Sequence, residues 1–229
     1  MNKKFFESPV ARRLFLARVG AGVGMFGATL GTASAAGTQS TPQTPWAPTR
    51  HEQDEWYDQI PGKHRLVFDT TSPESMEAAL RFSNTFFEAN KSGYGLQDAD
   101  LAVLVVARHK STVFGFNDAM WAKYGVELSK DANNFVDPKT KEAAIVNVYA
   151  TQGGQMNGLL KRGVHIPICQ MATRRIAGIL ARATGGKADE VLAELSANLV
   201  TNGHLVAAGI VAVNRAQEHG YALAHVEHF

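Results

Sequence analysis

The sequence predicts an α/β fold, a layered structure of parallel strands and helices. Apolar runs of strand length alternate with longer segments of helical period, which is the order of crossover units in a parallel sheet. The run Asp100–Ala107 is apolar at almost every position, as a strand covered by helices on both faces requires. Both observations lie within residues 64–229, where we expect the folded domain.

The elements of this domain can be assigned in order. Arg65–Asp69 reads as a buried strand, and the helix after it has Ser72 as its cap and Pro73 at its first position, which predicts a helix to about Ala89. The remaining elements are expected as a strand at 100–107, a helix at 116–123 ending at Gly125, a helix at 156–161, a strand at 164–168, helices at 172–183 and 188–199, a short strand at 205–207, a helix at 210–218 and a final strand at 221–226.

The stretch from 133 to 155 is polar, contains proline and glycine, and has no clear period. It predicts a long loop, and long loops inside compact domains tend to cover a site or make oligomer contacts.

The first 63 residues differ from the rest. Residues 1–35 have a basic start, a short apolar run and small residues at 33–35, which predicts an export signal. Residues 36–63 read as a linker followed by a short docking segment, in which Trp46, Trp56 and Tyr57 are expected to pack onto the domain.

The charge of the chain is concentrated in the signal. The first 35 residues carry five of the 23 basic residues and one of the 21 acidic ones, which leaves 18 basic and 20 acidic residues in the body. Such a body has no basic excess to neutralise phosphates, so we expect no nucleic-acid binding.

The single cysteine, Cys169, is the candidate nucleophile. It follows the apolar run Val164–Ile168 and precedes a helical segment, which predicts a position at a strand's carboxyl end and a helix amino terminus. The unpaired N–H groups of that helix end, with Arg174 and Arg175 nearby, favour a thiolate. The alternative is a small buried hydrophobic residue, which is the commoner role of a lone cysteine.

Other candidate residues follow the first two strands. The carboxyl ends of parallel strands meet at one edge of the sheet, so Asp69, Arg108 and His109 are expected to share a crevice with Cys169. Arg108 or His109 is suited to hold a thiolate or an anion, and Asp69 to orient a histidine. A Cys-His-Asp hydrolase remains an alternative, although no nucleophile elbow is present.

Metal and nucleotide sites are not indicated. No second cysteine stands at metal-ligand spacing from the first, and the His225 and His228 spacing does not align two side chains on a strand. The first strand is followed by neither GxGxxG nor a P-loop.

Two resemblances carry further expectations. The paired Arg12-Arg13, with Phe15-Leu16 shortly after, resembles a twin-arginine (Tat) signal, although Ala11 and Ala17 depart from its pattern. The order of elements, with Gly163-Val164 leading to Cys169, resembles the DsrE/DsrF family of small sulfur-relay proteins, which includes TusD-type subunits. That resemblance implies a mostly parallel five-stranded sheet with helices on both faces, in flavodoxin-like or Rossmann-like layers. It also implies trimers or hexamers and a persulfide on Cys169, with Arg175 as a supporting basic residue and no cofactor.

The expected function is therefore an exported, periplasmic sulfur carrier or sulfurtransferase-like protein. Its expected partners are the Tat translocon, further copies of itself, and a small sulfur-containing species or a sulfur-relay protein. The alternative is a periplasmic binding or assembly module with the same fold and no chemistry.

Overall fold

The computed structural model describes residues 47–226. The Tat-type signal expected at 1–35, the linker residues up to Trp46, and His228 lie outside the described residues. The described part forms one compact unit from Ala47 onward, and none of its helices is long and apolar enough to cross a bilayer.

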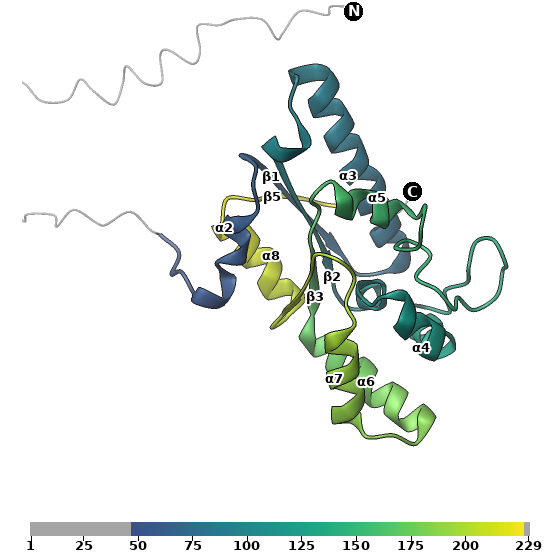
Figure 1. The fold of residues 1–229 in the computed structure, drawn as a ribbon. Helices are drawn as coiled ribbons and strands as arrows, with labels where there is room; N and C mark the ends of the chain where they lie inside the picture. The colour runs from purple at the N-terminus through teal and green to yellow at the C-terminus, as the bar shows by residue number, and fades with distance from the viewer. Residues whose placement is uncertain (1–46, 227–229) are drawn as a thin grey trace, which may run out of the picture. The chain divides into compact units, whose positions relative to one another are not determined.

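The centre of this unit is a five-stranded, all-parallel sheet in the order β4-β3-β2-β1-β5 (Figure 1). The strands are β1 His64–Thr70, β2 Leu101–Ala107, β3 Ile166–Cys169, β4 Gly203–Val206 and β5 Ala222–Ala224. Every residue of β2 is buried, because β2 lies in the middle of the sheet with helices on both faces. The expected fold is confirmed.

Helices cover the two faces unequally (Figure 1). The larger core lies under α3 Pro73–Tyr94, α4 Asp118–Asp131, α5 Gln155–Lys161, α6 Gln170–Thr184 and α7 Ala188–Ala197, with the 3-10 turn η3 Ser111–Gly115. The other face is covered by α8 Gly209–Glu218 and by the short segments η1 Glu52–Asp54 and α2 Trp56–Gln59; a further 3-10 turn, η2 Asp98–Asp100, precedes β2.

The start of α3 matches its sequence signals. The Ser72 side chain accepts the N–H of Ser75 and the Ser75 side chain accepts the N–H of Ser72, with Pro73 at the first helical position. The helix runs on to Tyr94, past the expected end near Ala89, and stops at Gly95 in the left-handed conformation.

The expected end of the next helix was wrong. α4 runs from Asp118 to Asp131, straight through Gly125, and Asn117 caps its start. Gly125 is there for space: a Cβ at this position would lie 2.2 Å from the carbonyl oxygen of Ala144. Gly125 allows the long loop to pack directly onto α4, and the helix continues through this position.

The loop at 133–155 packs onto the domain that contains it. It has no helix or strand before α5, but Asn147 and Ala144 are buried, and Tyr149 packs edge-on against Phe114. The Asn147 side chain donates to the carbonyls of Phe114 and Phe116, both at 2.8 Å. Val136 and Ile145 remain exposed, so only part of the loop surface is open to another molecule.

The expected docking segment is part of the fold. Tyr57 is fully buried in the second core, its hydroxyl donates to the Ala212 carbonyl at 3.3 Å, and its own carbonyl accepts from Tyr221 at 3.1 Å. Arg65 donates to the carbonyls of Tyr57 and Ile60. The packed unit therefore begins at Ala47, well before His64.

Candidate functional site

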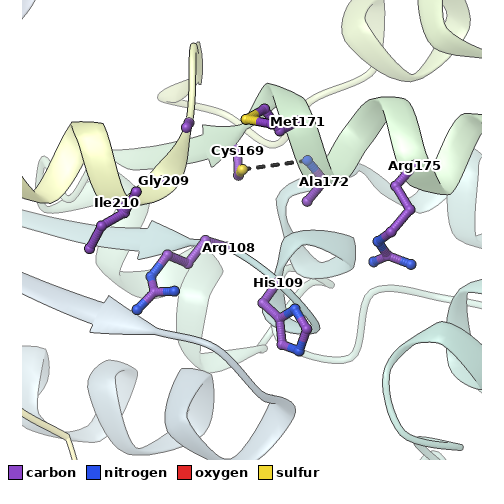
Figure 2. Close-up of a pocket in the computed structure, with 9 residues that line it drawn as sticks. Arg108, His109, Cys169, Met171, Ala172, Arg175, Gly209 and Ile210 are labelled. Carbon is purple, nitrogen blue, oxygen red and sulfur yellow. Dashed lines mark hydrogen bonds between the residues drawn. The ribbon is translucent and has the colours of Figure 1, made fainter.

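The carboxyl ends of the central strands form the expected crevice. A pocket of about 310 Å³ opens there, and Figure 2 shows its lining. The lining residues are Arg108, His109, Cys169, Met171, Ala172, Arg175, Ala208, Gly209 and Ile210. They come from the ends of β2 and β3, the first two turns of α6 and the start of α8.

Cys169 is the last residue of β3 and the N-cap of α6. Its Sγ accepts the N–H of Ala172 at 3.4 Å, drawn in Figure 2, and its carbonyl accepts the Thr173 hydroxyl at 2.9 Å. The side chain is buried but lines the pocket, with the residue 8% exposed. An N–H donor at a helix amino terminus stabilises negative charge on sulfur, so the position suits a thiolate.

Arg108 follows β2 and is fixed by Asp69 at the end of β1. Its Nε donates to Oδ1 at 2.6 Å and its Nη2 to Oδ2 at 2.7 Å. The hydrogen bond that Arg108 donates to Asp69 is the main reason that the pKa of Arg108 is raised, and the charge of a Cys169 thiolate adds a smaller contribution. Asp69 therefore orients an arginine; the expectation that it orients a histidine was wrong.

His109 lines the pocket beside Arg108 and has φ 56°, in the left-handed region. Few residues other than glycine adopt this conformation without a cost of about 1–2 kcal/mol. The turn is held below by Ser111, whose Oγ accepts the N–H of Arg108 at 3.0 Å and donates to the Thr70 carbonyl at 2.9 Å.

Arg175 borders the pocket one turn into α6, but its guanidinium is already paired. Both Nη1 and Nη2 donate to the carboxylate of Asp131, the latter at 2.8 Å, and Lys110 approaches the same carboxylate at 3.4 Å. The Asp131 hydrogen bond raises the pKa of Arg175, and a Cys169 thiolate contributes to the same shift more weakly. Burial alone would raise the pKa of Asp131, but the two cations hold it below its usual value.

Arg174 does not belong to the site. It is exposed on α6 and does not line the pocket, since neighbouring helix residues point about 100° apart. The structure thus gathers Cys169, Arg108, His109 and Arg175 around one pocket, places Asp69 behind Arg108, and leaves Arg174 outside.

Several residues of this site were missed from the sequence. Gly209, Ala208 and Ile210 follow β4, so the rule that placed the other strand ends at one edge could have found them. Asp131 carried no such signal, because its role depends on how the end of α4 packs against α6.

A second cluster lies outside the pocket lining, near the amino end of β3 and beside the core under α8. His165 Nδ1 and His204 Nε2 are 2.8 Å apart, and the Trp56 indole stacks on His204 with ring centroids 3.9 Å apart. Burial lowers the pKa of both imidazoles, that of His204 to about 4 with the proximity of His165 as a second cause. Both rings are therefore neutral near pH 7. Within residues 47–226, no group of three or more metal-ligating side chains is positioned to hold a metal ion.

Comparison with known proteins adds little to this geometry. No family model matches the chain, and no curated protein matches it. One solved structure, a protein of unknown function from Methanobacterium thermoautotrophicum, aligns over 71% of this chain and 99% of its own length, with 14% identity and a TM-score of 0.37. At this identity and TM-score the alignment supports no functional assignment.

Proposed function

We propose that the protein is a sulfur carrier or sulfurtransferase-like protein that holds a persulfide on Cys169. The observation that carries the proposal is the placement of the Cys169 Sγ at the amino terminus of α6, where it accepts the Ala172 N–H inside a pocket bordered by Arg108 and Arg175. The resemblance to DsrE/DsrF proteins points to the same residue.

The proposed step needs no cofactor. The Cys169 thiol loses its proton to solvent, and the thiolate attacks the outer, sulfane sulfur of the donor. A new sulfur–sulfur bond forms as the donor's own sulfur–sulfur bond breaks, and the leaving thiolate or sulfite takes the electron pair. Oxidation states balance within the exchange, so no external oxidant is required.

Intact-mass spectrometry tests this directly. After incubation with a sulfane-sulfur donor, the wild-type chain should gain the mass of one sulfur atom, and Cys169→Ser should not. Because Cys169 is the only cysteine, a single variant removes every thiol. Absence of the adduct in the wild type, or an equal adduct in the variant, would refute the proposal.

A specific observation favours the alternative, a binding or assembly module without chemistry. Met171 and Ile210 line the pocket and are 68% and 59% exposed. Large apolar side chains at a pocket mouth are typical of contact surfaces. A chain that forms no persulfide but retains a ligand or partner in this pocket would support the module.

We also propose a homo-oligomer, a trimer or hexamer, exported to the periplasm through the Tat translocon. Support for assembly comes from β5, a three-residue edge strand whose Leu223 is 45% exposed, and from exposed Val211 on α8. Light scattering on the mature chain tests assembly: a monomer at all concentrations would overturn it. Whether the 133–155 loop contributes to the contact between copies is tested by Ile145→Ser and not by deletion of the loop, because deletion would also remove the buried Asn147.

A further inference from the structure

Gly209, the first residue of α8, touches the side chain of Arg108. A Cβ at this position would lie 2.3 Å from Cβ of Arg108 and 2.9 Å from its Cδ. Real Cβ atoms do not approach this closely, so any residue larger than glycine forces the arginine stem to move. The reason for glycine here is space, since Gly209 is not among the glycines with positive φ.

The other side of Arg108 is held by Asp69. The carboxylate takes Nε and Nη2, which leaves Nη1 without a hydrogen-bond partner among residues 47–226. Arg175 differs, because Asp131 takes both of its terminal nitrogens and leaves only Nε. Of the two arginines at the pocket, Arg108 is thus the one that retains a terminal nitrogen with two N–H donors for a ligand.

The size and charge of the pocket limit what it accepts. At about 310 Å³ it is at the small end of ligand pockets. Arg108 and Asp69 cancel in formal charge, while Asp131 is shared by Arg175 and Lys110, so these five groups leave one net positive charge beside Cys169. A small anion fits both conditions.

We propose that Gly209 and Asp69 are positioning residues that fix Arg108 as the anion-binding group of the Cys169 pocket, so that the pocket selects small anionic sulfur compounds. This inference rests on the proposed function of Cys169. The sulfane sulfur of the donor meets Cys169, and its anionic end lies against Arg108 beneath the start of α8, where Figure 2 shows the guanidinium below Ile210.

Two alkylating reagents measure this selection without any sulfur donor. Iodoacetate is anionic and iodoacetamide is neutral, and both react with the same thiolate of the single cysteine. Their rate ratio therefore cancels the pKa of Cys169 and reports the local preference for an anion. Because a neutral control reagent is built into the ratio, a change in thiol exposure alone affects both rates.

Gly209→Ala is expected to lower the iodoacetate-to-iodoacetamide ratio by about three- to tenfold, as loss of a nearby cation from a partly screened site would. Arg108→Gln is expected to lower it at least as much, and Arg108→Lys to restore part of it. The matched control is Gly158→Ala: this glycine lies in α5, and a Cβ there meets nothing within 4 Å. Its ratio should equal that of the wild type.

The outcomes separate the two claims. An unchanged ratio in both Gly209→Ala and Arg108→Gln overturns the inference, and a fall in Arg108→Gln alone supports anion selection but overturns the role of Gly209. Where Gly209→Ala does not fold, the two Arg108 variants still decide anion selection. Failure of Cys169 to form a persulfide would refute the proposed function without changing the iodoacetate-to-iodoacetamide ratio, so the two failures are distinguishable.

Discussion

Replacement of His204 by glutamine should flatten the acid side of the stability profile. In the folded protein the His204 ring is half-buried, 2.8 Å from His165 and stacked under Trp56. Burial, with a contribution from His165, lowers its pKa from 6.5 to about 4. In the unfolded chain the ring titrates at its ordinary pKa.

The sign follows from proton binding. Between pH 6.5 and 4 the unfolded chain binds a proton at His204 that the folded protein does not, so the free energy of unfolding falls as the pH falls through this window. The full contribution is present above pH 6.5. A shift of this size corresponds to about 3 kcal/mol, and screening of a half-exposed ring reduces the expectation to about 1–2 kcal/mol.

Urea denaturation at pH 7 and pH 4.5, followed by tryptophan fluorescence, measures the effect. The wild-type loss of unfolding free energy between these pH values should exceed that of His204→Gln by about 1–2 kcal/mol. His64→Gln, at the exposed start of β1, is the control and should behave as the wild type. Equal losses in His204→Gln and the wild type, or a larger loss in the variant, would refute the reasoning.

Two further predictions concern the long loop. Gly125→Ala should lower the free energy of unfolding by about 1–3 kcal/mol, because the new Cβ would lie 2.2 Å from the Ala144 oxygen; thermal unfolding would show this, and a midpoint at or above the wild-type value would contradict the close approach. Asn147→Ala should cost about 2–4 kcal/mol, because two buried carbonyls at the end of η3 lose their donor; urea midpoints equal to the wild type would count against it.

Local patterns in the sequence predicted most of the fold. The strands were placed within a few residues, because fully buried parallel strands such as β2 leave long apolar runs. Cys169 was placed correctly between a strand and a helix. The apolar run Val164–Ile168 precedes it, and the helical segment that follows it is ended by Gly185. The end of α4 was missed because Gly125 has the local signature of a terminator, and only the packed loop reveals its other role.

The site was predictable only in part. Arg108 and His109 could be grouped with Cys169 because all strands of a parallel sheet have their carboxyl ends at the same edge. Asp131 could not, since its carboxylate reaches Arg175 only through the packing of two helices. The His165–His204 contact likewise depends on the register of β3 against β4, in which Pro167 is opposite His204, and no local pattern encodes that register.

The pairing of β5 with β1 has a consequence for synthesis of the chain. Of the five strands in this sheet β1 is synthesised first, yet its outer neighbour β5 is synthesised after the other four, and the Tyr221 contact to Tyr57 also waits until Tyr221 has been made. An unpaired strand edge invites pairing with other nascent chains. The outer edge of β1 is therefore open to misassembly during the interval between synthesis of β1 and synthesis of β5, and a chain truncated before residue 222 would leave that edge open permanently.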